Sequence, residues 1–128
     1  MEKIFYLILI CTICLLTVGC GNNNTSTTNN NVVESITASE VKEILDNKDE
    51  KYILIDVREE SEYNEGHIPG AVNIPLGNIN SIEYDKDKII IVYCRSGVRS
   101  REAANKLNNI GYTVKDMGGI IGWNYEIE

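Results

Sequence analysis

The sequence is poor in basic side chains, in histidine and in cysteine. Its 128 residues include 12 Lys and Arg against 19 Asp and Glu, which gives a formal net charge of −7. An acidic chain without a basic stripe argues against nucleic acid as a partner, because phosphate binding needs clustered positive charge. The single histidine, His67, leaves no cluster of histidine and cysteine ligands, so we expect no metal site.

The chain also lacks an apolar run long enough to cross a membrane. Residues 4–18 are apolar and uncharged, and this length of helix reaches about 22 Å of a hydrocarbon core of about 30 Å. A run of this length is typical of a secretory signal. The following "LLTVGC" resembles a bacterial lipoprotein signal, although Thr17 stands where Leu is commoner. The resemblance implies cleavage after residue 19 and lipid transfer to the sulfur of Cys20.

Two alternatives to lipidation are an uncleaved short anchor and a signal that is cut elsewhere. In each case we expect the domain to lie outside the cytoplasm, attached to the cell membrane. Residues 20–31 are expected to form a flexible tether, because "GNNNTSTTNNN" is polar, of low complexity and has nothing to bury. The folded domain is then predicted over residues 32–128.

The few cysteines can each be assigned to a segment. Cys11 and Cys14 leave with the signal and Cys20 carries the lipid, so Cys94 is the one cysteine of the predicted domain. No intramolecular disulfide is then available. A lone thiol in an extracytoplasmic protein is a liability unless it is used or deeply buried.

The domain is predicted to be α/β, with a central, mostly parallel sheet flanked by helices. Continuous apolar runs at residues 51–57 and 88–94 are typical of strands buried on both faces. Thr37 and Glu40 match a capping box for a helix that ends near Asn47. The remaining expected elements are a short helix closed by Gly66, a strand at 71–75, a helix that begins near 98–100 and stops at Gly111, a strand at 112–117, a tight glycine turn at 118–119 and a helical segment at 120–126.

Cys94 comes at the carboxyl end of the strand at 88–94, where parallel sheets gather ligands and catalytic groups. The amides of residues 95–99 precede the next helix, and backbone N–H groups at a helix N-terminus bind anions. Three of the four arginines, Arg95, Arg99 and Arg101, cluster here. Such surroundings lower the pKa of a thiol and favour the reactive thiolate. We therefore interpret Cys94 as a nucleophile rather than as a small buried hydrophobic residue.

Three motifs, in order, resemble the single-domain rhodanese (thiosulfate sulfurtransferase) family: "DVREESEYNEGHIPGAVNIP", "CRSGVRS" and "MGGIIGW". The resemblance covers residues 36–126 and implies a rhodanese-like three-layer domain. It implies transfer of sulfane sulfur from a donor such as thiosulfate to cyanide or a thiol, through a persulfide on Cys94 and without a cofactor. The same resemblance implies a loop whose amides hold the persulfide, comprising Arg95, Ser96, Gly97, Val98 and Arg99. Within that loop, Arg99 would lend charge at the helix start and Arg95 would recruit an anionic donor.

The other residues of these motifs are expected to have mainly structural roles. Asp56 and Arg58 allow two interpretations: a charged network that pins loops, or, as the resemblance implies, a pair near the active site that influences Cys94. His67 allows two interpretations, a general base or, as the resemblance implies and as we expect, a residue whose hydrogen bond orders its loop. Glu62 is interpreted as a solvated residue or as the partner of an arginine, and Trp123 as a residue that packs the terminal helix.

Two other functions compete with sulfur transfer. A small phosphatase or arsenate reductase needs a loop that fits a tetrahedral oxyanion, and tyrosine phosphatases hold five residues between Cys and Arg. Here four residues separate Cys94 from Arg99, and Ser100 takes the position at which that arginine would lie. A non-catalytic binding module is the second alternative, against which the retained Cys94 argues.

Overall fold

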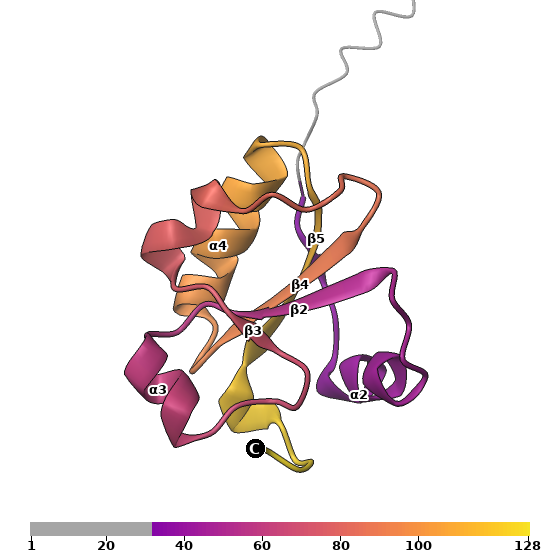
Figure 1. The fold of residues 1–128 in the computed structure, drawn as a ribbon, viewed down its shortest axis with the longest axis vertical. Helices are drawn as coiled ribbons and strands as arrows, with labels where there is room; N and C mark the ends of the chain where they lie inside the picture. The colour runs from indigo at the N-terminus through magenta and orange to yellow at the C-terminus, as the bar shows by residue number, and fades with distance from the viewer. Residues whose placement is uncertain (1–31) are drawn as a thin grey trace, which may run out of the picture.

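The computed structural model describes residues 32–128 (Figure 1). The signal peptide predicted over residues 1–19, the predicted lipidation of Cys20 and the tether predicted over residues 20–31 all concern positions outside the described residues. Within residues 32–128, no helix is both long and apolar enough to cross a membrane. The elements, in chain order, are β1 (Glu34–Ser35), α2 (Ala38–Asp46), β2 (Tyr52–Asp56), α3 (Glu60–Glu65), β3 (Val72–Asn73), the 3-10 helix η1 (Leu76–Ser81), β4 (Ile89–Cys94), α4 (Val98–Asn109), β5 (Thr113–Gly119) and the 3-10 turn η2 (Ile120–Gly122).

The five strands form one sheet in the order β1-β5-β4-β2-β3, and every pairing is parallel. This arrangement confirms the predicted α/β class. β4 lies in the middle of the sheet, and its residues from Ile90 onward are all buried. A strand covered on both faces needs apolar side chains on both, which explains the unbroken run "IIIVY".

Helices cover both faces of the sheet and give three layers (Figure 1). On one face, α4 and η1 pack on alternate residues of β4, among them Val92 and Cys94. On the other face, α2 and the C-terminal segment pack on Ile91 and Tyr93. The period-two alternation of a strand therefore directs the side chain of Cys94 to the α4 side and that of Tyr93 to the opposite side.

The predicted capping box starts α2. The Thr37 amide donates to the Glu40 carboxylate at 2.8 Å, and the Glu40 amide donates to the Thr37 hydroxyl at 3.3 Å. Two amides at the helix N-terminus that have no partner within the helix are thereby satisfied.

The predictions for residues 118–126 are wrong in two places. β5 continues through Gly118 and Gly119, where a tight turn was expected, because a β-bulge lies there. Val92 pairs with Asp116 and Tyr93 with Gly118, so Met117 is the extra residue. The Asp116 side chain accepts from the Gly118 amide at 2.8 Å, and Gly118 has a φ of +84°, which favours glycine.

The second error concerns the expected helix at 120–126, where the structure has only the short turn η2. The residues that follow η2 make other contacts, which a helix over this segment would prevent. His67 and Glu128 exchange backbone hydrogen bonds of 2.9 and 3.0 Å, and the Trp123 indole donates to the Glu126 carbonyl at 3.0 Å. Trp123 is buried on the α2 face, so it packs against the sheet and not within a terminal helix.

Candidate active site

Cys94 ends β4 and faces the start of α4 across a short loop. Its side chain is buried, and its Sγ accepts from the Gly97 amide at 3.0 Å. Gly97 has a φ of +105°, and this left-handed conformation turns the chain from the strand into α4, which begins at Val98. The loop thus folds its own amides back over the sulfur.

The electrostatics around the sulfur favour the thiolate. Burial works against the charged form, but hydrogen bonds from the backbone amides of Ser100, Gly97 and Ser96 outweigh it and lower the pKa of Cys94. These amides belong to the N-terminal turn of α4 and the residues before it, where the helix dipole also favours an anion. The predicted activation of Cys94 therefore has a structural basis.

Ser100 is a residue of this site that sequence reasoning missed as a contributor. It is fully buried, and its hydroxyl donates to the Gly97 carbonyl at 3.1 Å, which braces the loop that surrounds Cys94. Its position in the first turn of α4 could have predicted this role. A side chain in that turn points back towards the loop that precedes the helix, and a small hydroxyl there can hydrogen-bond to the loop backbone.

Arg99 reaches away from the loop to α3. Its Nη1 and Nη2 atoms donate to the two carboxylate oxygens of Glu62 at 2.7 and 2.9 Å. Glu62 also accepts from the Glu59 amide at 2.9 Å. The Arg99 hydrogen bonds are the largest cause that holds the pKa of Glu62 at about 2, so its carboxylate is ionised throughout the neutral range. Of the two interpretations of Glu62, the partner of an arginine is the one that holds.

The other loop residues are more open. Arg95, Ser96 and Val98 have exposed side chains, so they form the surface of the site rather than its base. The backbone carbonyl of Arg95 accepts from the Ile121 amide at 3.4 Å, which holds the loop against the end of β5. The position of Arg95 is compatible with the predicted recruitment of an anionic donor, because its charge lies at the surface.

Residue 119 must be glycine because the loop that follows Cys94 passes close to it, and not because a turn lies there. A Cβ atom at this position would lie 2.5 Å from the Arg95 carbonyl oxygen and 2.9 Å from the Ser96 Cα. Both of these are backbone atoms, so the loop would have to move. Cys94 and Gly119 are paired residues of β4 and β5, and this pairing brings the two segments close together.

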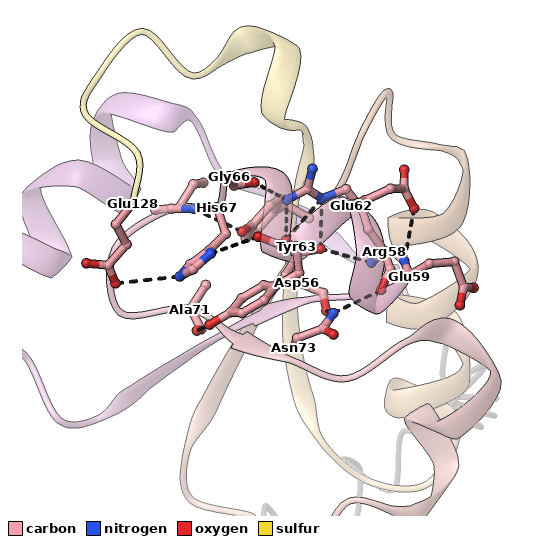
Figure 2. Close-up of polar contacts among 12 residues, drawn as sticks. Asp56, Arg58, Glu59, Glu62, Tyr63, Gly66, His67, Ala71, Asn73 and Glu128 are labelled. Carbon is pink, nitrogen blue, oxygen red and sulfur yellow. Dashed lines mark hydrogen bonds and ion pairs between the residues drawn. The ribbon is translucent and has the colours of Figure 1, made fainter.

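Asp56 and Arg58 form a buried ion pair at the end of β2 (Figure 2). Arg58 Nη2 donates to Asp56 at 2.6 Å and to the Gly66 carbonyl at 2.8 Å, and its guanidinium lies 5.8 Å from the centre of the Tyr93 ring. Among the described residues, none of the hydrogen bonds of this pair reaches Cys94. The pair thus holds the Gly66 loop and the residue before Cys94, as the loop-pinning interpretation predicts.

His67 orders the loop that follows α3, as expected. Its Nδ1 lies 3.0 Å from the Tyr63 carbonyl oxygen, and its ring stacks on the Tyr63 ring with centroids 3.7 Å apart (Figure 2). Tyr63 in turn donates to the Ala71 carbonyl at 2.9 Å. The ring of His67 is therefore engaged in contacts within its own loop.

A cavity of about 480 Å³ lies beside the loop. Its walls come from β1, the loop, the first turn of α4 and the bulge of β5: Ser35, Ile36, Ser96, Gly97, Val98, Arg101, Asp116, Met117 and Gly118. Within residues 32–128, no three His, Cys, Asp or Glu side chains lie together in a way that could hold a metal ion.

Comparisons with known proteins agree with this geometry. The model of the rhodanese-like domain family matches residues 37–126. The YtwF protein of Bacillus subtilis (strain 168) is 41% identical over 97 residues, which cover 73% of this chain and 93% of that protein. The thiosulfate:glutathione sulfurtransferase of Saccharomyces cerevisiae is 32% identical over 108 residues, covering 71% of this chain and 78% of that protein.

The crystal structure of the BH2092 protein from Bacillus halodurans superposes with a TM-score of 0.68 at 31% identity, covering 74% of this chain and 76% of that chain. Some relatives are much longer, and the match spans only 12 to 25% of their length. The parallel sheet, the cysteine loop and the match over residues 37–126 lead to one assignment: the chain belongs to the rhodanese-like domain family.

Proposed function

We propose that this protein is a sulfurtransferase that moves sulfane sulfur through a persulfide on Cys94. The observation that carries the proposal is the sulfur itself, which is buried at a strand end and accepts hydrogen bonds that lower its pKa. The thiolate is the form that attacks sulfur, so a lowered pKa increases the reactive fraction at neutral pH.

The reaction proceeds in two balanced steps. The Cys94 thiolate attacks the outer sulfur of a donor such as thiosulfate, a new S–S bond forms, and the S–S bond of the donor breaks with its electron pair leaving on sulfite. A nucleophile, cyanide or a thiol, then attacks the terminal sulfur and releases the Cys94 thiolate. Covalent exchange of this kind gives ping-pong kinetics. The name of the yeast relative, which pairs thiosulfate with glutathione, supports a thiol as acceptor.

The loop supplies hydrogen bonds for the persulfide anion. The Gly97 amide donates to the Cys94 sulfur, and the Ser96 and Ser100 amides also lower its pKa, so the terminal sulfur would extend among backbone donors. Preorganised backbone donors of this kind stabilise developing charge without rearrangement. The exposed Arg95 is placed to attract an anionic donor to the mouth of the loop.

Intact-mass measurement tests the proposal most directly. The protein is incubated with thiosulfate and with an organic thiosulfonate, then with cyanide, and the Cys94→Ser variant serves as the control because it keeps any other cysteines. We expect a gain of one sulfur atom that cyanide removes and that the variant lacks. No gain with either donor contradicts the proposal and favours a binding module, and faster turnover of para-nitrophenyl phosphate than of sulfane donors favours a phosphatase.

We also propose that the protein is held outside the cytoplasm by a lipid on Cys20. This proposal rests on the "LLTVGC" pattern and the polar tether that follows it. Labelling of cells with a radioactive fatty acid tests it, because Cys20→Ser abolishes the label on the protein if the proposal is correct. Labelling that persists in the variant contradicts it.

A further inference from the structure

Arg99, the second arginine of the loop that follows Cys94, is not an isolated cation. Arg99 is held by two parallel hydrogen bonds to Glu62, at 2.7 and 2.9 Å. The two side chains are 32% and 29% exposed, so the pair lies at the open edge of the site. The Glu59 amide fixes the carboxylate of Glu62 at 2.9 Å, which orients the pair from the α3 side.

This pairing removes a positive charge from the site. A guanidinium and a carboxylate joined in this way have no net charge, so their field at a distance is that of a dipole. The pKa of Arg99 is raised, mainly by its hydrogen bond to Glu62 and also by the charges of Cys94 and Glu59. These groups therefore lie within range of one another's charge.

We infer that Glu62 is a positioning residue that sets the charge preference of the Cys94 loop: by neutralising Arg99, it makes the site favour monoanionic sulfane donors over dianionic ones. The inference rests on the proposed sulfur transfer and deepens it by naming a substrate class. That class comprises organic thiosulfonates and organic persulfides, which carry one negative charge at the sulfur end, whereas thiosulfate carries two. A dianion gains twice as much from an unpaired arginine as a monoanion does, so it loses more when Glu62 is present.

Two donors of similar size isolate the effect of charge. With thiosulfate, the Cys94 thiolate takes the outer sulfur and the electron pair of the broken S–S bond leaves on sulfite. With methanethiosulfonate, the same bond forms and the electron pair leaves on methanesulfinate. Both donors give the same Cys94 persulfide anion, and cyanide removes its terminal sulfur as thiocyanate in each case.

The test is the ratio of kcat/KM for thiosulfate to kcat/KM for methanethiosulfonate, with cyanide as acceptor. For Glu62→Gln we expect kcat/KM for thiosulfate to rise roughly two- to fivefold, the range for a partly exposed ion pair, mainly through a lower KM. The value for methanethiosulfonate rises less, so the ratio increases. High salt reduces this gain, because solvent-exposed charges are screened.

Three further variants separate charge from structure. Arg99→Gln leaves Glu62 unpaired and lowers the ratio below that of the unmodified protein. The double variant Glu62→Gln/Arg99→Gln restores neutrality, so its ratio returns to the starting value even if both rates fall. Glu60→Gln is the matched control, because it makes the same change in the same helical turn outside the ion pair, and it leaves the ratio unchanged.

The inference is overturned if Glu62→Gln leaves the ratio unchanged, or if it reduces kcat/KM equally for both donors, since Glu62 would then be only structural. It is also overturned if the double variant keeps the altered ratio. Failure of the proposed function looks different, because Cys94 would then form no persulfide with either donor.

Discussion

Two ion pairs flank the end of β4, and they differ chiefly in burial. The side chains of Asp56 and Arg58 are 0% and 8% exposed, and their pair lies beside the ring of Tyr93. The side chains of Glu62 and Arg99 are 29% and 32% exposed, and their pair lies at its edge. Both are close Arg–carboxylate contacts of 2.6 to 2.7 Å, so distance does not distinguish them.

Burial decides what each pair can do. A buried charge that loses its partner has no water to replace it, so the buried pair matters for stability. A half-exposed pair contributes little to stability, since water and salt compensate for its loss, but its charges act on whatever approaches the surface. The comparison indicates that the two pairs, although near enough for the charge of Arg58 to act on Glu62, serve different purposes: the buried pair supports the fold, and the half-exposed pair is open to charged molecules at the surface.

The largest expected effect comes from breaking the buried pair. Asp56→Asn leaves the Arg58 guanidinium buried without a countercharge, and we expect a loss of about 3–5 kcal/mol in the free energy of unfolding. The same chemical change in the other pair, Glu62→Gln, is expected to cost less than about 1 kcal/mol. Denaturant titration of both variants measures the difference. Equal losses would show that burial does not separate the two pairs.

The next largest effect is expected from the close approach of Gly119 to the loop at residues 95–99. Gly119→Ala places a Cβ atom 2.5 Å from the Arg95 carbonyl oxygen, so the loop must shift. We expect a loss of about 1–3 kcal/mol in stability, the usual cost of overpacking, and slower alkylation of Cys94 by iodoacetamide as its amide donors move away. Gly122→Ala is the control, because nothing lies within 4 Å of the added atom. Unchanged alkylation in Gly119→Ala would mean that the loop tolerates the shift.

A smaller change tests the hydroxyl that braces the loop. Ser100→Ala removes the hydrogen bond to the Gly97 carbonyl, so the loop amides hold the thiolate less firmly and the pKa of the thiol rises. We expect the pH profile of Cys94 alkylation to move to higher pH and the rate below neutral pH to fall. Ser96→Ala is the matched control, because Ser96 contributes through its amide, which the substitution keeps. Equal shifts in both variants would contradict a role for the Ser100 hydroxyl.

The smallest expected effect is the acid dependence of the half-exposed pair. The Arg99 hydrogen bonds depress the pKa of Glu62 from 4.5 to about 2. The stabilisation by this pair is therefore fully present above about pH 4.5 and is lost as the pH falls towards about 2. The difference in unfolding free energy between the unmodified protein and Glu62→Gln, under about 1 kcal/mol near neutral pH, should shrink over that interval. Chemical denaturation at several pH values measures it, and a difference that grows on acidification would reverse the sign assigned here.

The sequence predicts best those features that are encoded locally. The apolar runs of β2 and β4, the capping box of Thr37 and the position of Cys94 at a strand end depend on neighbouring residues, and the structure has them where they were expected. The partner of Glu62 is 37 residues away, so only the folded chain reveals which arginine it binds. The role of Gly119 likewise depends on a close approach between β5 and the loop, which no local pattern encodes.

The incorrect and the missing predictions concern elements that depend on distant contacts or that leave no periodic pattern in the sequence. Residues 120–126 lack a strong helix signal of their own, and the backbone hydrogen bonds between His67 and Glu128 fix the end of this segment on the loop after α3. Two elements were not predicted: β1 is short, exposed and without an apolar run, and η1 is a 3-10 helix, which lacks the 3.6-residue period.

The bulge in β5 also bears on how this chain can change in length. Because Met117 is the residue that opposes no partner on β4, the pairs Val92–Asp116 and Tyr93–Gly118 would become consecutive if it were deleted. Cys94 would still lie opposite Gly119, and the cysteine loop would keep its neighbour. The bulge is thus a point at which a residue can be gained or lost without changing the pairing of Cys94 with Gly119, although one wall of the cavity beside the loop would be remodelled.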